Sequence, residues 1–161
     1  MYKRQARQAI TAGVSRFVFV SSVKVNGEET SERPYTAFDE PAPTDPYGIS
    51  KLEAEVALKK LAEETGLEVV IVRPPLIYGP GVRANFQRLM QLVKMGLPLP
   101  LGAINNRRSM VAVENLHDLL ILCTSHPAAV GQTFMVSDDH DVSVSTFCLL
   151  YTSDAADDTP C

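Results

Sequence analysis

Short apolar runs alternate with longer amphipathic stretches along the first half of the chain. Residues 16–21 and 68–73 are almost continuously apolar, as parallel strands covered on both faces are. Between them, Leu52, Val56, Leu58 and Leu61 recur at helical spacing among charged residues, and Gly66 follows where the periodic pattern stops. This order of strand, helix and strand predicts a parallel crossover with the helix over 46–66.

The pattern predicts further elements on either side of this unit. Residues 6–13 have the character of a helix end, with Gly13 at the position that a C-terminal cap prefers. The segment 26–46 is rich in Glu, Thr and Pro and predicts a long active-site loop. Two more helices, at about 86–95 and 115–125, and two short strands, 111–113 and 132–137, complete an α/β fold.

A tyrosine and a lysine at the start of the central helix are the first candidate chemistry. Tyr47 and Lys51 are four residues apart, so they share one helix face and the ammonium lies close to the phenol. A neighbouring positive charge helps a phenol to exchange a proton near neutral pH. Ser22 follows the strand 16–21, at the end where open α/β sheets place ligands. The alternative is coincidence, because Tyr-x-x-x-Lys alone is a common spacing.

Four motifs in order carry a wider resemblance. They are the segments 20–27, 45–51, 73–81 and 107–111, with the sequences VSSVKVNG, DPYGISK, RPPLIYGPG and RRSMV. Together they resemble the extended short-chain dehydrogenase/reductases, in particular the NAD-dependent epimerase/dehydratase family. Within that family the chain is similar to epimerases and 4-keto reductases of nucleotide sugars.

The resemblance implies roles for individual residues at the reacting centre. Tyr47 is implied as the acid/base acting on the C4 oxygen of the sugar, with Lys51 assisting it and holding the nicotinamide ribose. Ser22 would orient the same oxygen. The resemblance places Ser21, Pro74, Pro75 and Ile77 beside NAD or NADP, although Ser21 is often structural in relatives and two prolines also serve simply to stop a strand.

The same resemblance implies a nucleotide-sugar site later in the chain. Asn85 matches a diphosphate contact, but an asparagine before a helix is equally an ordinary N-cap. Arg108 matches the phosphate-binding arginine, and a guanidinium pairs bidentately with phosphate oxygens. Leu99 and Leu101 match the stretch along the uracil base, and an apolar loop packed on the core explains them equally well.

The resemblance also predicts that the chain is part of a longer protein. No glycine spacing for a pyrophosphate turn occurs in the sequence. We therefore expect the C-terminal part of a Rossmann-type doubly wound sheet, without its N-terminal strands and Gly-rich loop, plus part of the small nucleotide-sugar-binding domain.

Residues 1–5 and 148–161 resemble translated sequencing adapters. Residues 6–82 would form the partial Rossmann domain and 83–147 the substrate-binding region, and the fragment alone is expected to be inactive.

The two residues after Ser22 narrow the reaction. The 4,6-dehydratases need a carboxylic pair there, whereas this chain has Val23 and Lys24. A UDP-hexose or UDP-N-acetylhexosamine 4-epimerase and a UDP-4-keto-6-deoxy-hexosamine reductase both need only Ser, Tyr and Lys, and the fragment does not separate them. A non-catalytic dinucleotide-binding member is a further alternative, although such members usually lose the Tyr or Lys.

Composition adds few constraints. The net charge of −4 gives no electrostatic argument for nucleic acid or membrane partners. Outside the adapter-like tail Cys123 is the only cysteine, which fits a reducing cytoplasm and a small core residue.

The family resemblance suggests a homodimer through the helix with Tyr47 and Lys51. His117, His126 and His140 lack metal-ligand spacing, and Glu53, Glu55, Glu63 and Glu64 are interpreted as a solvated helix face.

Overall fold

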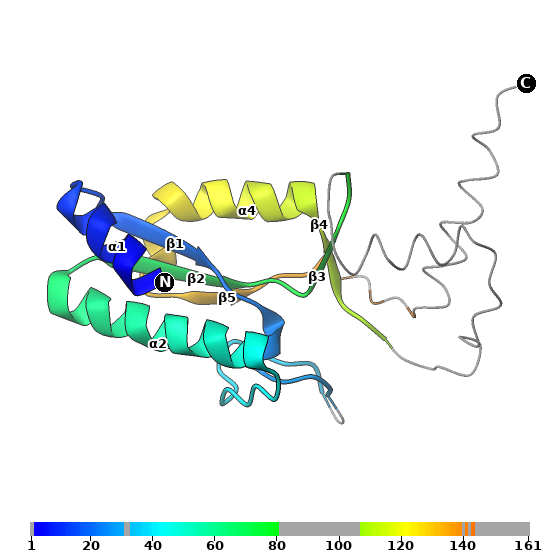
Figure 1. Cartoon of the computed structure of the whole chain (residues 1–161). Helices are drawn as coiled ribbons and strands as arrows, with labels where there is room; N and C mark the ends of the chain where they lie inside the picture. Colours follow the sequence, from blue (N-terminus) through cyan, green and yellow to red (C-terminus); the bar gives the residue numbers. More distant parts are fainter. Residues whose placement is uncertain (1, 31–32, 81–106, 140, 142, 144–161) are drawn as a thin grey trace, which may run out of the picture. The chain divides into compact units, whose positions relative to one another are not determined.

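The computed structural model describes residues 2–30, 33–80, 107–139, 141 and 143. The chain divides into two compact units, one of residues 1–75 and 115–136 and the other of residues 76–114 and 137–161. The first unit holds α1 (Tyr2–Thr11), β1 (Arg16–Val20), α2 (Pro46–Thr65), β2 (Glu68–Arg73) and β5 (Thr133–Met135), and most of α4 (Val113–Ser125). Two short 3-10 turns, η1 (Val23–Val25) and η3 (Pro127–Ala129), complete it. Figure 1 labels the helices and strands.

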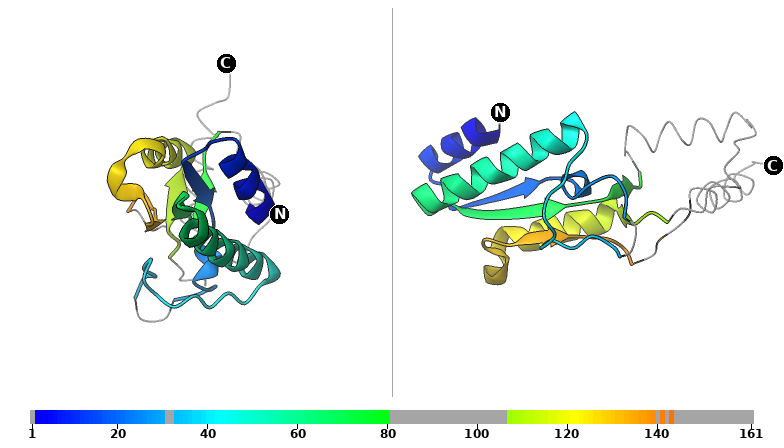
Figure 2. Two further views of the ribbon diagram at one scale, coloured as in Figure 1. Left: turned by 90° about the vertical axis from the view of Figure 1, so that its left-hand side faces the viewer. Right: turned by 90° about the horizontal axis from the view of Figure 1, so that it is seen from below.

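The three strands of the first unit form a parallel sheet in the order β1-β2-β5. Arg16 pairs with Glu68 and Val20 with Val72, so β1 and β2 begin and end side by side. In Figure 2, α1 and α2 cover one face of the strands and α4 lies over the other. The parallel crossover predicted from the apolar pattern is confirmed.

One hydrophobic core fills the space between the strands and the first two helices. It combines Ala6 of α1 and Ala54, Leu58 and Leu61 of α2 with Phe19, Leu67, Val69 and Ile71 from the strands and their approaches. Val70 and Val72 point to the opposite face by strand alternation and are fully buried. Leu116 and Cys123 of α4 are buried too, as predicted for Cys123.

Both ends of α2 are set by local signals, of which the sequence analysis predicted the Gly66 end. Asp45 precedes the helix with extended backbone, and its side chain accepts a hydrogen bond from the Gly48 N–H, while Pro46 takes the first helical position. Gly66 ends the helix in the left-handed conformation, with φ of 73°, and donates its N–H to the Ala62 carbonyl. Helix α2 therefore has a fixed length and a fixed start, immediately before Tyr47.

Two expectations from the pattern are wrong. Strand β1 is not covered on both faces: only Phe19 is buried, and Val20 is 36% exposed. The reason is its place at the edge of the described sheet, where β2 is its one paired strand. Glu55 is not on a solvated face either, since it is 1% exposed whereas the apolar Val56 is 59% exposed. Residue type alone thus misassigned the buried face of α2.

The second unit is built around a pair of short parallel strands. Strand β3 (Leu76–Tyr78) pairs with β4 (Met110–Ala112), from Leu76 opposite Met110 to Tyr78 opposite Ala112. The Asp138 carboxylate accepts hydrogen bonds from the Tyr78 hydroxyl and the Ala112 N–H, each at 2.8 Å. The hydrogen bond to Asp138 raises the pKa of Tyr78. The predicted helix over 86–95 lies outside the described residues.

Candidate active site

The carboxyl ends of β1 and β2 bring the first candidate residues together. The Ser21 N–H donates to the Val72 carbonyl at 2.7 Å, and the Val23 N–H donates to the Pro74 carbonyl at 3.0 Å. Ser22 lies between these two bonds, where its hydroxyl accepts from the Lys24 N–H and caps η1. The half-buried Ser22 and the buried Pro74 therefore occupy neighbouring strand ends, which is the edge where parallel sheets bind ligands.

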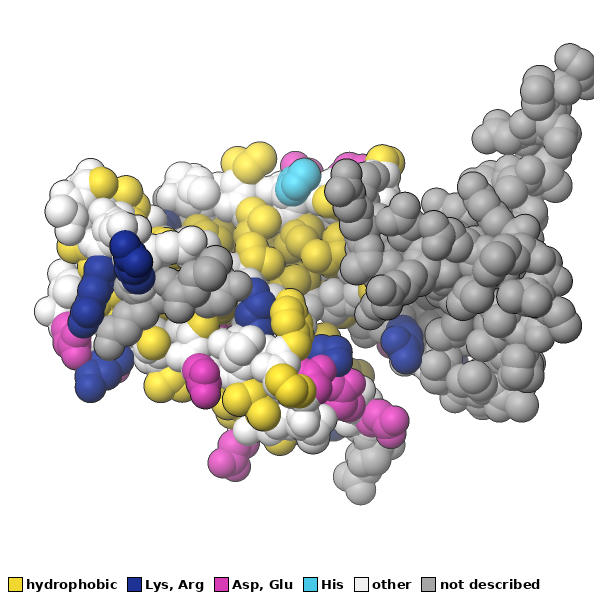
Figure 3. Space-filling view, in the orientation of Figure 1, with side chains coloured by type: hydrophobic (Ala, Val, Ile, Leu, Met, Phe, Trp, Pro, Cys, Tyr) yellow, Lys and Arg dark blue, Asp and Glu magenta, His cyan; other side chains and the backbone are white. Residues whose placement is uncertain are grey.

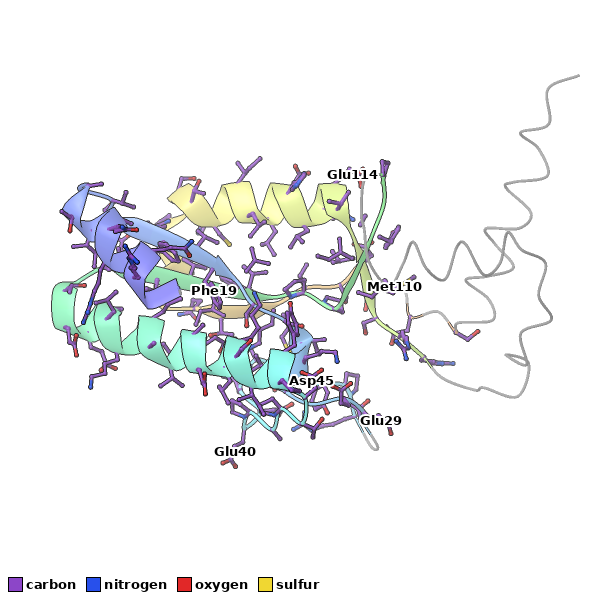
Figure 4. All side chains as sticks on the ribbon, viewed as in Figure 1. Phe19, Glu29, Glu40, Asp45, Met110 and Glu114 are labelled. Atoms are coloured by element: carbon purple, nitrogen blue, oxygen red, sulfur yellow. The ribbon has the colours of Figure 1, made fainter. Side chains whose placement is uncertain are left out.

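Lys51 joins α2 to this edge of the sheet. Its Nζ donates to the carbonyl of Val20, the last residue of β1, at 3.0 Å. The ammonium also lies 5.0 Å from the centre of the Phe19 ring and 5.6 Å from that of Tyr47, close enough for cation–π attraction. Figure 4 shows Phe19 between the strands and the helices that cover them. Lys51 is buried while Tyr47 is 52% exposed, so the phenol is open to solvent beside a sequestered cation.

Gly48 allows α2 to approach the segment after Ser22. A Cβ atom at this position would lie 2.7 Å from the Lys24 carbonyl oxygen and 3.0 Å from the Pro43 Cβ. The first distance is too short for a real Cβ atom and the second is tight, so the turn that carries Tyr47 favours glycine here. The small residue in the DPYGISK motif thus sets the spacing between helix and strand end.

An exposed charge cluster holds the start of α2. The Lys24 ammonium pairs with Asp45 and, at 2.9 Å, with Glu28. The Gly48 N–H and then Lys24 lower the pKa of the Asp45 carboxyl, and the hydrogen bonds to Asp45 and Glu28 raise the pKa of Lys24. Figure 4 labels Asp45 at the N-terminal end of α2. Lys24, which sequence reasoning considered only as a residue that is not a carboxylate, therefore fastens the helix N-cap to η1.

A buried ion pair adjoins the site and was missed from the sequence. Arg73 and Glu55 form two hydrogen bonds, Nε to Oε1 at 2.9 Å and Nη2 to Oε2 at 2.6 Å. Their side chains are only 3% and 2% exposed. The Ser21 hydroxyl donates to Glu55 Oε1 at 2.6 Å, which supports the structural alternative for Ser21. The available signal was the spacing of Glu55, four residues beyond Lys51 and hence on the same buried face.

The remaining candidates fall elsewhere. Pro75 follows β2 and is half-buried. Ile77 lies within β3, and Arg108 is exposed just before β4, so both belong to the second unit. The predicted contacts Asn85, Leu99 and Leu101 lie outside the described residues. The structure thus brings Ser22, Lys51 and Pro74 together at the carboxyl ends of β1 and β2. It leaves the predicted sugar-nucleotide residues untested.

Residues 4–137 match the model of the NAD dependent epimerase/dehydratase family. This chain belongs to that family. Among curated relatives, the UDP-glucose 4-epimerase of Vibrio cholerae is 54% identical over 142 residues, which cover 87% of this chain and 43% of the relative. The N-acetyl-alpha-D-glucosaminyl-diphospho-ditrans,octacis-undecaprenol 4-epimerase of Escherichia coli O157:H7 is 30% identical over 138 residues, which cover 83% of this chain and 40% of the relative.

A solved structure supports the epimerase/dehydratase fold. The UDP-glucuronic acid 4-epimerase of Bacillus cereus in complex with NAD matches with a TM-score of 0.81 over 94% of this chain and 50% of that chain, at 18% identity. At this identity the likeness shows the fold alone. The chain spans less than half the length of the curated relatives described above.

Neither a metal cluster nor a membrane-spanning helix occurs among the described residues. They contain no group of three or more His, Cys, Asp or Glu side chains placed to hold a metal ion. No helix within the same residues is both long enough and apolar enough to cross a membrane. His126 has a structural role, since its Nδ1 accepts from the Ala128 N–H at the start of η3.

Proposed function

We propose that this chain carries the acid/base part of an NAD(P)-dependent nucleotide-sugar 4-epimerase. The observation that carries the proposal is the Lys51 ammonium, bonded to the Val20 carbonyl and 5.6 Å from the Tyr47 ring. Tyr47 is accessible beside this fixed ammonium, so it can take a proton from a sugar hydroxyl and later return it, as general acid/base catalysis requires. Ser22 can donate its hydroxyl to the same sugar oxygen.

The groups at this edge fit the ribose and nicotinamide of a dinucleotide. Lys51 offers an ammonium donor for hydroxyl oxygens, and the half-buried Pro75 offers apolar surface for a flat ring. Lys51, Pro74 and Pro75 would hold these parts of the cofactor. A cofactor contact of Ile77 in β3 stays a separate prediction. NAD or NADP held there would supply the acceptor and donor of the hydride at C4 of the sugar. The task of Tyr47 is to move the hydroxyl proton in the same step.

Epimerisation is favoured over the alternatives by the relatives and by the residues after Ser22. The V. cholerae relative, at 54% identity, is named a UDP-glucose 4-epimerase. Val23 and Lys24 occupy η1, and the Lys24 ammonium pairs with Asp45 and Glu28. Neither side chain is a carboxylate, so these two positions lack the carboxylic pair that a 4,6-dehydratase needs. A UDP-4-keto-6-deoxy-hexosamine reductase would use the same Ser22, Tyr47 and Lys51, and it is the second candidate.

Arg108 is the residue we assign to the sugar-nucleotide diphosphate. Its guanidinium is exposed, and a planar fork of donors suits two phosphate oxygens. Asn85, Leu99 and Leu101 would contact the same ligand.

We further propose that the intact protein is a homodimer through α2, where Ile49 and Val56 are seven residues apart on one exposed face, at 44% and 59% exposure.

The test uses a chimera, because the chain spans 43% of the V. cholerae relative. In it, residues 4–137 replace the corresponding residues of that relative. The chimera is given UDP-glucose, UDP-N-acetylglucosamine or a UDP-4-keto-6-deoxy-hexosamine. Formation of the 4-epimer without added reductant supports the epimerase, whereas stoichiometric consumption of NADH or NADPH with the keto sugar identifies the reductase.

Tyr47→Phe is the matched variant for this assay. It removes one oxygen from a half-exposed ring, so the unfolding midpoint in urea should stay unchanged. General acid/base catalysis contributes about 10²–10⁴-fold, and turnover should fall by that factor. A folded chimera that turns over none of the three sugars, or a Tyr47→Phe chimera with full turnover, would contradict the proposal.

A further inference from the structure

A buried polar network adjoins the candidate active site. The Glu55 carboxylate, 1% exposed, accepts from Ser21 Oγ at 2.6 Å and from two nitrogens of Arg73. The third contact of the guanidinium is Arg73 Nη1 to Asn26 Oδ1 at 3.0 Å, and Asn26 Nδ2 in turn donates to the Thr36 carbonyl at 3.1 Å. Ser21, Asn26, Glu55 and Arg73 are all at most 3% exposed.

Each member of the network is a close neighbour of a candidate site residue. Ser21 precedes Ser22, Arg73 precedes Pro74, and Glu55 follows Lys51 by one helical turn. Asn26 caps the C-terminal end of η1, the turn that Ser22 begins. The network therefore joins the ends of β1 and β2 to the helix that presents Tyr47 and Lys51, and through Thr36 it reaches the long loop.

Lys51 and Glu55 tie α2 to consecutive residues of the first strand end. Lys51 donates to the carbonyl of Val20, and Glu55 accepts from the hydroxyl of Ser21. Two attachments one turn apart fix both the height and the rotation of a helix, which a single bond does not. A fully buried ion pair is often no more stabilising than apolar residues of similar volume, so the geometry it imposes is its distinctive contribution.

We propose that Glu55 and Arg73 are positioning residues which hold Lys51 and Tyr47 at the correct height over the carboxyl ends of β1 and β2. This inference rests on the proposed function, in which Tyr47 and Lys51 perform the proton transfer. Glu55 and Arg73 are buried, and we assign neither of them a contact with the sugar. Their loss changes where the acid/base pair stands, and through that the rate of the chemical step.

The test replaces both charges at once in the chimera, as Glu55→Met/Arg73→Met. This change avoids leaving one charge buried alone, which is the usual cause of unfolding in single variants. Misplacement of reacting groups by about 1 Å costs up to roughly 10²-fold, so kcat should fall by at least about tenfold, with KM changed by less than about threefold. The pH profile of kcat should change as well.

A second readout does not depend on activity. With ¹⁵N-labelled lysine, the Lys51 ammonium is assigned by its disappearance in Lys51→Met. Because Nζ is bonded to the Val20 carbonyl, its protons exchange slowly enough to be detected when α2 is held in place. The signal should be lost in Glu55→Met/Arg73→Met. If the chimera without further substitutions turns over no sugar, the proposed function fails and this signal alone decides the inference.

The matched control is Arg16→Met/Glu68→Met, which removes the ion pair at the opposite ends of the same two strands. It should keep kcat within about twofold and retain the Lys51 signal. Should the first double variant not fold, Arg73→Lys keeps the charge, loses the forked geometry and is expected to change kcat, pH profile and signal in the same direction. A folded variant of either kind with unchanged kcat, pH profile and signal overturns the inference.

Discussion

The two ends of the β1–β2 pair are closed by ion pairs of opposite character. At the amino ends, Arg16 Nε meets Glu68 Oε2 at 2.8 Å, with side chains 13% and 40% exposed. At the carboxyl ends, Arg73 meets Glu55 with 3% and 2% exposed. The first pair is open to water on the side of Glu68, whereas the second is sealed inside the protein. The buried ion pair therefore lies at the carboxyl ends of the strands, beside the candidate active-site residues.

The amino end serves stability. Arg16 Nη1 donates to the carbonyls of Cys123 and His126, at 3.2 and 2.9 Å, and so satisfies the C-terminal end of α4. A cation at a helix C-terminus is also favoured by the helix dipole. Burial raises the pKa of the neighbouring Cys123 thiol, consistent with a structural residue. This part of the molecule joins a strand to a helix without presenting chemistry to solvent.

Apolar surface is distributed unevenly as well. In Figure 3, apolar side chains are uncovered between α4 and the strands. The exposed apolar residues include Val20 at the end of β1 and Ile121 and Leu122 on α4. Beta-strand edges with exposed apolar residues invite pairing with further chain, and β1 is such an edge among the described strands.

The largest expected difference between the two ends is in the cost of losing one charge. In the chimera, Glu55→Gln leaves the Arg73 guanidinium buried without a carboxylate and should lower the free energy of unfolding by roughly 3–5 kcal/mol. Glu68→Gln breaks the partly exposed pair, in which Arg16 keeps its bonds to two carbonyls, and should cost about 1 kcal/mol. Urea unfolding measures both. Equal losses would show that the two ends are alike.

A smaller contrast concerns two glycines of α2, Gly48 in its first turn and Gly66 at its C-cap. Gly48→Ala forces a Cβ to within 2.7 Å of the Lys24 carbonyl and should cost about 1–3 kcal/mol as overpacking. Gly66→Ala meets nothing within 4 Å, but its φ of 73° should cost about 1–2 kcal/mol. Because only Gly48 lies beside the strand end, turnover should fall in Gly48→Ala and persist in Gly66→Ala. A steady-state assay with unfolding curves separates the two effects.

The smallest effect concerns pH at the helix start. The Gly48 N–H and Lys24 lower the pKa of Asp45, so its contribution to stability is complete above the unfolded value of about 4 and is lost as pH falls through the folded pKa. Asp45→Asn keeps an N-cap oxygen but does not ionise. The variant should lose less stability between about pH 5 and pH 2 than the chimera without further substitutions.

Lys24→Met sharpens this prediction. It removes the ammonium but keeps the Gly48 hydrogen bond to Asp45, so its acid sensitivity should be intermediate. Urea midpoints measured across the acid range give the three slopes. Identical slopes in all three proteins would mean that Asp45 does not contribute in this way.

The sequence predicted the elements whose signals are local. Helix α2 has an Asp–Pro start and a Gly end within its own residues, and the Tyr47–Lys51 spacing needs only helical geometry. The exposure of β1 could not be predicted because it depends on which strands pair with it. The burial of Glu55 depends on Arg73, which is 18 residues away on another element, so residue type favoured the wrong face. Roles for Ile77 and Arg108 remain predictions, as do those for Asn85, Leu99 and Leu101.

One measurement tests the central claim most directly: the rate of UDP-sugar epimerisation by the chimera carrying Lys51→Met, compared with the chimera carrying Arg16→Met. The two cations lie at opposite ends of β1, one bonded to the Val20 carbonyl and the other to Glu68. If the carboxyl end is the active site, Lys51→Met lowers kcat by about 10²–10⁴-fold and Arg16→Met leaves it nearly unchanged. Equal rates in two folded variants would contradict the account.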